Sequence, residues 1–184
     1  MKFWTSLIGY QLVWFAAVIG AGRGLAWPGM VGMLLYATCQ LAVWHHFKVD
    51  LSLMATAIVL GLLIDGGLIH TGLASYAAPW PSAAMTPAWI LALWATFALT
   101  LTQSLIWLQT RPWFAVLLGA MGGPLAYLSA SRGWHVVSFA DPAWRGLLWL
   151  GIGWALATPT LTWLAARWSI DAAPATISLQ GDAP

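Results

Sequence analysis

Long runs of apolar residues fill the chain, separated by short segments that carry Gly, Pro or charged residues. The runs are continuous, as in residues 58–64, and do not alternate between apolar and polar positions. Alternation is typical of membrane β-barrels, whereas about 20 consecutive apolar residues are what a helix needs to cross ~30 Å of hydrocarbon. Because lipid offers no partner for backbone N–H and C=O groups, these runs predict transmembrane helices.

Six such runs divide the chain. They cover residues 3–22, 28–44, 51–73, 87–108, 113–130 and 143–166. The predicted fold class is therefore all-α: a polytopic transmembrane bundle of about six helices over residues 1–166. Residues 167–184 are polar and rich in Ala, Pro and Ser, which predicts a disordered tail.

Composition supports this class. Of the 184 residues, 61% are hydrophobic and only 7% are charged, whereas a soluble domain has about 25% charged residues. Six spans leave no room for a separate soluble catalytic domain.

The basic residues are scattered singly, so nucleic acid is not an expected partner. We find no catalytic motif, no metal-ligand pattern and no sign of a cofactor, and an enzyme is the less favoured class.

The distribution of basic residues between the predicted loops gives an orientation. The positive-inside rule assigns the more basic side to the cytoplasm. One side holds four of these residues and the other holds three: Lys2, Lys48, Arg111 and Arg167 against Arg23, Arg132 and Arg145. Both termini are therefore expected in the cytoplasm.

Tryptophan is unusually frequent, with 15 residues. Ten of them fall near predicted span ends, where indole prefers the membrane interface. The other five lie deeper, and packing is favoured over pocket lining for them: Trp14, Trp94, Trp149, Trp154 and Trp163.

Asp65 is the acidic residue placed well inside a predicted span, where a carboxylate costs about 3 kcal/mol or more. We expect it to be protonated or to meet a donor, and Arg23 or Arg132 at the same side could pair with it. Tyr127 would point its hydroxyl toward this level, and His70 lies nearby. One interpretation is an ion pair that fixes helix packing. The other is a site for a head group, a carboxylate or a proton.

A second polar level is expected in the other half of the bundle. It comprises Gln11, Gln103 and Ser104, and a hydrogen bond between the two glutamines across helices is the favoured interpretation. In the fifth span Gly119 and Gly123 are four residues apart, which predicts a flat face for close helix contact.

Four motifs occur together along the chain. They are Gln11-x-x-Trp14-Phe15 with Gly20-Ala21-x-Arg23-Gly24, then Leu60-Gly61-x-x-x-Asp65, then Pro87-x-Trp89-Ile90-x-Ala92-Leu93-Trp94 leading to Ser104, and Gly119-Ala120-x-Gly122-Gly123-Pro124-Leu125-Ala126-Tyr127. This combination resembles a family of small bacterial inner-membrane proteins known as a domain of unknown function. The family pattern has Asn-His before the serine of the fourth span, where this chain has Thr102-Gln103, so no imidazole role carries over to that place.

The resemblance implies a bacterial inner-membrane location. Its members neighbour genes for fatty-acyl methyltransferases and flavin oxidoreductases, which implies an association with lipid modification. The first hypothesis is an accessory protein that binds membrane lipids or a lipid-modifying membrane protein. A small-solute or proton-coupled transporter that uses Asp65 with Arg23 or Arg132 is the alternative, and a membrane enzyme acting on acyl chains is the third. The sequence does not determine the oligomeric state.

Overall fold

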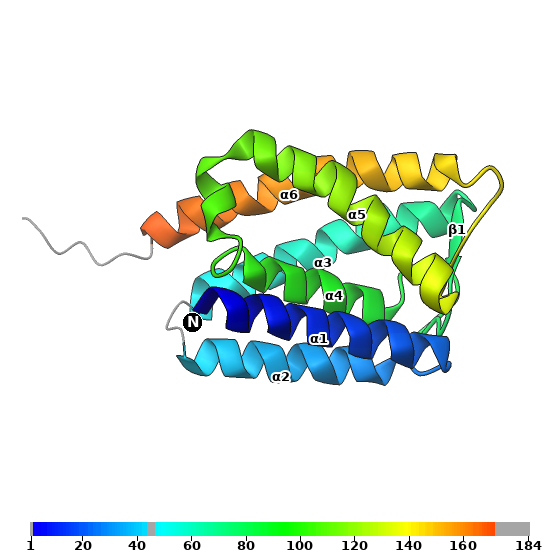
Figure 1. Ribbon diagram of the computed structural model, residues 1–184, viewed down its shortest axis with the longest axis horizontal. Helices are drawn as coiled ribbons and strands as arrows, with labels where there is room; N and C mark the ends of the chain where they lie inside the picture. Colours follow the sequence, from blue (N-terminus) through cyan, green and yellow to red (C-terminus); the bar gives the residue numbers. More distant parts are fainter. Residues whose placement is uncertain (1, 44–46, 172–184) are drawn as a thin grey trace, which may run out of the picture.

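The computed structural model describes residues 2–43 and 47–171, and these are mostly helical (Figure 1). The elements in chain order are α1 Lys2–Gly22, α2 Trp27–Val43, α3 Phe47–His70, β1 Ala74–Tyr76, α4 Ala88–Thr100, the 3₁₀ helix η1 Ile106–Thr110, α5 Pro112–Trp134, β2 Val137–Phe139 and α6 Trp144–Asp171. The predicted all-α bundle is confirmed. Among the described helices, α1, α3, α5 and α6 are long and apolar enough to cross a membrane.

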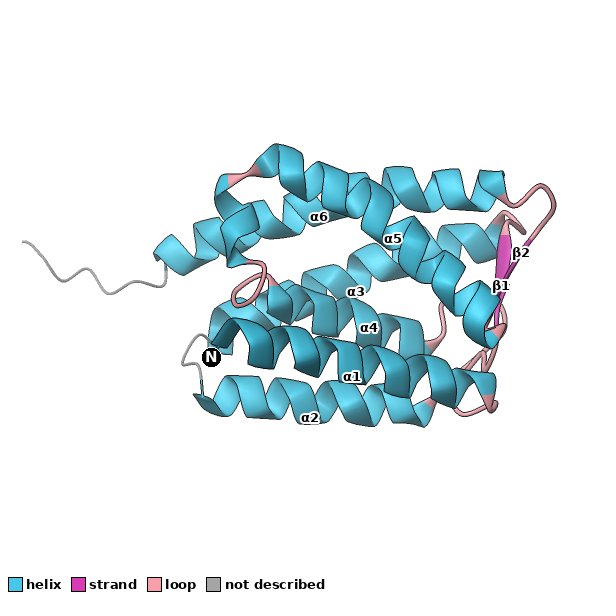
Figure 2. Cartoon of the chain, in the orientation of Figure 1, coloured by secondary structure: helices cyan, strands magenta, loops and turns pink. Residues whose placement is uncertain are grey.

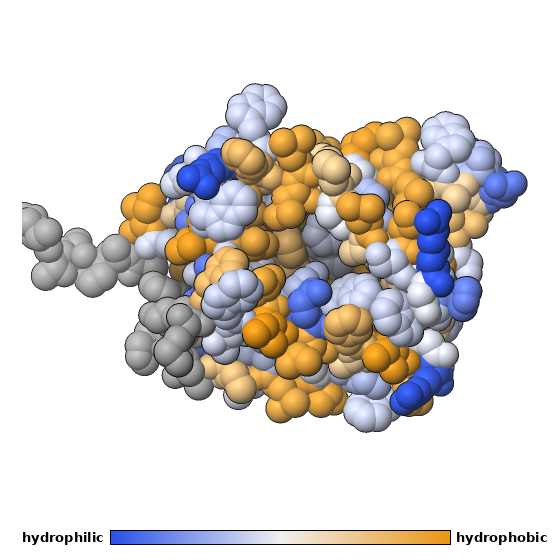
Figure 3. Space-filling view, viewed as in Figure 1, coloured by the Kyte–Doolittle hydropathy of each residue, from blue (hydrophilic) through white to orange (hydrophobic). Residues whose placement is uncertain are grey.

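The helices lie side by side, with α4 enclosed in the middle (Figure 1). The pair α1 and α2 lies on one side of α4, the pair α5 and α6 on the other, and α3 behind it. Helix α4 is apolar around its whole circumference and almost all of its side chains are buried, as expected of a helix without a polar face. By contrast, many large apolar side chains are exposed on the outside of the bundle, and Figure 3 shows one face of this surface, which suits lipid rather than water.

Helix α4 ends earlier than the sequence pattern predicts. The fourth span was expected to run without a break to residue 108, but the α-helix stops at Thr100, and turns over residues 101–105 lead into η1. Side-chain amides compensate for the lost helical hydrogen bonds. Gln40 Nε2 donates to the Leu99 carbonyl at 2.8 Å, and Gln109 Nε2 donates to the Leu101 carbonyl at 2.9 Å. The break is thus stabilised by tertiary contacts.

Replacing Gln40 with leucine is expected to lower the free energy of unfolding by about 1–3 kcal/mol, because the buried Leu99 carbonyl would lose its amide donor. Reversible unfolding in mixed detergent measures the change. Cys39→Ala on the exposed neighbour of Gln40 is the matched control, with little expected effect. Equal effects of the two substitutions would contradict this account.

The predicted loops also contain ordered structure. Residues of the third and fifth loops form β1 and β2, which pair antiparallel with Ala74 opposite Phe139 and Tyr76 opposite Val137. This two-stranded ribbon covers one end of the bundle (Figure 2), and we refer to that end as the ribbon end. Helix α6 continues to Asp171, beyond the predicted span end at residue 166. The rest of the predicted tail, residues 172–184, lies outside the described residues, as does residue 44 at the predicted end of the second span.

The closest helix contact joins α5 and α6, and the predicted flat face of α5 is its basis. A Cβ atom on Gly119 would collide with the backbone carbonyl of Trp154 and would lie 2.7 Å from the Thr158 hydroxyl oxygen. A Cβ atom on Gly123 would collide with the indole ring of Trp154. The two glycines therefore let α6 approach α5 at backbone distance and make room for one large ring between them.

Candidate functional site

Asp65 on α3 is fully buried and accepts three hydrogen bonds from aromatic side chains. The hydroxyls of Tyr76 and Tyr127 donate to Oδ1 at 2.7 and 2.6 Å, and the indole N–H of Trp94 donates to Oδ2 at 2.7 Å. These donors come from β1, α5 and α4, so the carboxyl group links the ribbon to two helices. Three converging donors stabilise a buried carboxyl group without a countercharge.

The sequence around Asp65 explains how Trp94 reaches it. Gly61 lies one helical turn before Asp65 on the same face of α3. A Cβ atom on Gly61 would lie 2.5 Å from Cδ1 of Trp94, so the bare backbone there provides the space for the indole ring. The ring packs over Gly61 and its N–H meets the carboxyl group of Asp65.

Tyr76 lies in the ribbon, outside the long helices. Burial, followed by the neighbouring Asp65 carboxyl group and by the Tyr127 hydroxyl, raises the pKa of Tyr76 well above its ordinary value. The phenol therefore keeps its proton at physiological pH and remains a donor to Asp65.

Of the residues that the sequence predicts around Asp65, the structure places one in contact with the carboxyl group and leaves three away from it. It brings Tyr127 onto Asp65, whereas Arg23, Arg132 and His70 are exposed and none of them bonds to the carboxyl group. Asp65 thus meets donors, as expected, but the possible pair with Arg23 or Arg132 does not form, since neutral donors occupy the carboxyl oxygens. Because uncharged donors already satisfy the carboxyl group of Asp65, the exposed arginines have no reason to approach it.

Two donors to Asp65 were missed by the sequence interpretation. Trp94 was recognised as a deep tryptophan but was assigned to packing, and Tyr76 fell in a predicted loop. Asp50 was also placed in a loop, yet α3 begins at Phe47, and Asp50 is fully buried in the first turn, where the Thr102 hydroxyl donates to it at 2.9 Å.

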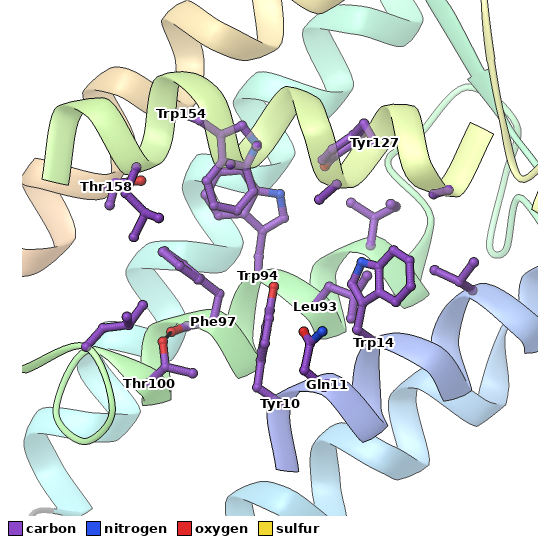
Figure 4. Close-up of a pocket in the computed structure, with 18 of the residues that line it drawn as sticks. Tyr10, Gln11, Trp14, Leu93, Trp94, Phe97, Thr100, Tyr127, Trp154 and Thr158 are labelled. Carbon is purple, nitrogen blue, oxygen red and sulfur yellow. Dashed lines mark hydrogen bonds between the residues drawn. The ribbon is translucent and has the colours of Figure 1, made fainter. Parts of the chain in front are cut away.

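A cavity of about 280 Å³ lies between α1, α4, α5 and α6, next to Asp65 (Figure 4). Trp94 and Tyr127 belong both to its wall and to the hydrogen bonds of Asp65, so the carboxyl group lies directly behind the wall. Aromatic rings supply much of the lining: Tyr10, Trp14, Trp89, Trp94, Phe97, Tyr127 and Trp154.

The rings are ordered around a stacked pair. The indoles of Trp94 and Trp154 stack with centroids 4.0 Å apart and an interplanar angle of 18°, and Phe97 meets Trp154 edge-on at 5.1 Å. Of the five deep tryptophans in the sequence, three therefore line the cavity. The other two, Trp149 and Trp163, are 39% and 58% exposed on α6.

The second predicted polar level is rearranged. Gln11 is exposed and lines the cavity, and no hydrogen bond joins it to Gln103 within the described chain. Ser104, which also lines the cavity, bonds instead to Ser6 on α1 at 3.1 Å, and Ser6 bonds to Tyr36 on α2 at 2.9 Å. The glutamine pair was a wrong prediction, while Ser104 does hold helices together.

The cavity opens through the side of the bundle. Figure 3 shows a hollow between α1 and α5 in the same view as Figure 1. Toward the ribbon end, α1 and α5 meet through Trp14 and Phe15, whose rings lie 5.4 and 5.9 Å from that of Trp134. This aromatic contact bounds the opening at the ribbon end. The opening lies on the side of the bundle, where exposed apolar side chains surround it.

An apolar exterior, four helices of membrane-spanning length among the described residues and an aromatic internal cavity define this protein as a membrane-type helical bundle. The chain belongs to the family described as "Protein of unknown function (DUF2878)", whose model matches residues 3–160. This confirms the family resemblance inferred from the sequence. Neither the comparison with curated proteins nor the comparison with solved structures gives a match.

Proposed function

We propose that this protein is a non-catalytic component of bacterial lipid or fatty-acid modification in the inner membrane, with both termini in the cytoplasm, and that it binds part of a lipid in the lateral cavity. The supporting observation is the aromatic cavity between α1, α4, α5 and α6, which opens between α1 and α5. A ligand that enters through this side would reach the cavity from the bilayer without crossing water.

The size of the cavity limits what it holds. Pockets for drug-sized ligands measure roughly 300–1,000 Å³, and this one has about 280 Å³. It accommodates a segment of a lipid, and the remainder of the molecule extends through the opening among other lipids. The protein would in this way present one lipid molecule at a fixed position to a membrane-bound partner.

The hydrophobic effect does not provide selectivity here, because bilayer lipid is as apolar as the cavity wall. Selective binding has to come from shape and from hydrogen bonds. The stacked indoles of Trp94 and Trp154 and the edge of Phe97 form a fixed wall of defined shape. Polar groups on α1, at Tyr10 and Gln11, provide directional contacts.

The alternative function, a proton-coupled or small-solute carrier, has weaker support. It would use Asp65 with Arg23 or Arg132, but the carboxyl group is enclosed by its three donors and the arginines are exposed. Flux assays in proteoliposomes with the Asp65→Asn variant address it, and unchanged flux of the candidate solutes would exclude it.

Filling the cavity is expected to remove the bound lipid. Gly122 on α5 lines the cavity, and a Cβ atom there would meet only the Leu118 side chain at 3.7 Å, so Gly122→Leu can fold while its side chain occupies the cavity. We expect co-purified lipid to fall about tenfold or more, which corresponds to ~1.4 kcal/mol. Extraction and mass spectrometry of lipid per mole of purified protein measures this.

Gly133→Leu is the matched control, because Gly133 lies on the same helix, away from the cavity, with open space around its Cβ position. This variant should retain lipid as the unmodified protein does. Retention of the same lipid by Gly122→Leu at an unchanged amount would contradict the proposed function.

A further inference from the structure

The cavity wall carries no formal charge among the described residues that line it. The nearest acid described above, Asp65, lies behind Trp94 and Tyr127, with its oxygens occupied by their donors. An anionic head group such as a carboxylate or phosphate would therefore enter without a countercharge, and burying an uncompensated charge costs several kcal/mol. The part of a ligand that occupies the cavity has to be uncharged.

Tyr10 supplies a hydrogen-bonding group inside this neutral cavity. The chain has four tyrosines. The hydroxyls of Tyr36, Tyr76 and Tyr127 bond to Ser6 or Asp65. The hydroxyl of Tyr10 has no partner within the described chain, although its ring lines the cavity and packs edge-on against Phe97 at 6.4 Å. Figure 4 shows the ring of Tyr10 reaching from α1 into the cavity with its oxygen at the tip.

A tyrosine in an apolar environment usually pairs its hydroxyl, so the free hydroxyl of Tyr10 indicates a missing partner. The wall contains further donors without partners. The indole N–H of Trp154 and the hydroxyl of Thr158 are buried and make no hydrogen bond. Both of these atoms are buried, so among the unpaired hydroxyl and indole donors of the wall it is Tyr10 that a ligand reaches directly. The amide of Gln11 lies on the same helix beside the cavity (Figure 4).

The hydroxyl and amide groups of this wall can donate a hydrogen bond and the wall carries no charge, so it matches an uncharged ligand group that accepts one. We propose that the cavity binds an uncharged lipid segment with a carbonyl oxygen, of the ester or ketone type, and that this oxygen accepts a hydrogen bond from the Tyr10 hydroxyl. The proposal rests on the proposed function of lipid binding and specifies the ligand class. Fatty-acid anions and plain hydrocarbons are the classes that this site discriminates against.

Three probes of equal chain length test the ligand class on the full-length protein in a maltoside detergent, which has no carbonyl group. They are a long-chain fatty-acid methyl ester with a ¹³C-labelled carbonyl, the corresponding alkane, and the corresponding fatty-acid anion at alkaline pH. Equilibrium retention of each probe gives its affinity. We expect the ester to bind about tenfold more tightly than either other probe, a difference of ~1.4 kcal/mol. The labelled carbonyl stretch of the bound ester should move to lower frequency, which reports the hydrogen bond itself.

The matched variants are Tyr10→Phe and Tyr36→Phe. Both remove only a hydroxyl, but Tyr36 bonds to Ser6 and does not line the cavity. Tyr10→Phe should bring the affinity for the ester down to that for the alkane and abolish the infrared shift, while Tyr36→Phe should leave both unchanged. The infrared measurement on the unmodified protein needs no variant, so it decides the question even if Tyr10→Phe fails to fold.

The outcomes separate the two proposals. If none of the three probes is retained, the proposed function of lipid binding fails. Lipid binding stands but the carbonyl assignment is overturned if the alkane or the anion binds as tightly as the ester, if the carbonyl band of the bound ester does not shift, or if a folded Tyr10→Phe protein keeps the shift.

Discussion

Replacing Asp65 with alanine should lower the free energy of unfolding by about 3–5 kcal/mol. The substitution leaves two phenol hydroxyls and one indole N–H, from Tyr76, Tyr127 and Trp94, without an acceptor in a site where all of these groups are buried. Each unsatisfied buried donor costs about 1–3 kcal/mol, and the site can relax only in part. Reversible unfolding in detergent, followed by circular dichroism, gives the value.

Two further variants distinguish a hydrogen-bond effect from a cavity effect. Asp65→Ala combined with Tyr127→Phe should be more stable than Asp65→Ala alone, because one orphaned hydroxyl is removed together with its acceptor. Asp141→Ala, at an exposed carboxylate in the loop before α6, should change stability by less than about 0.5 kcal/mol. If Tyr127→Phe further destabilises the Asp65→Ala protein, the three-donor account is wrong.

Gly119→Ala should destabilise the protein by about 2–3 kcal/mol or more, although it adds a single methyl group. The added Cβ would collide with the backbone carbonyl of Trp154 and lie 2.7 Å from the Thr158 hydroxyl. A backbone carbonyl in a facing helix cannot change rotamer, so α5 and α6 have to separate along their length. The decrease in unfolding temperature in detergent measures the cost.

Gly122→Ala on the same helix is the control for this substitution. Its Cβ would lie 3.7 Å from the Leu118 side chain, an ordinary contact. Alanine has the higher helix propensity, so this variant should be neutral or more stable by up to about 1 kcal/mol. A Gly119→Ala protein as stable as Gly122→Ala would show that the two helices do not meet at backbone distance.

The fold class could be predicted because lipid offers no hydrogen-bond partners, so only helices and closed barrels satisfy the backbone. Continuous apolar runs of sufficient length leave helices as the consistent choice, and α1, α3, α5 and α6 coincide with four of these runs, with ends that differ by up to five residues. The end of α4 could not be predicted, since residues 101–105 are as suitable for a helix as the residues before them. Gln40, from another helix, and Gln109 stabilise that end by donating hydrogen bonds to the carbonyl groups of Leu99 and Leu101.

The candidate site was also predictable only in part: its central residue could be identified, but its partners could not. The cost of a carboxyl group in an apolar span identified Asp65 without any structural knowledge. The partners of Asp65 come from three other elements, and no periodic pattern in the sequence indicates which side chains will meet there. Charge complementarity suggested an arginine, but Trp94 and Tyr76 reach the carboxyl group from segments whose spacing from Asp65 carries no signal. The cavity was missed because its lining is shared by four helices, each ordinary when considered alone.

The ribbon at one end of the bundle has a consequence for how the chain is threaded through the membrane. Strands β1 and β2 pair directly, so the chain has to return to the same side after everything between them, namely α4, η1 and α5. The number of crossings in that stretch is therefore even. Counting α5, which is long and apolar enough to cross a membrane, as one crossing requires the short α4 together with η1 to count as a second, although α4 alone has 13 residues, about 20 Å of rise. A pair of three-residue strands thus requires an even number of membrane crossings between them.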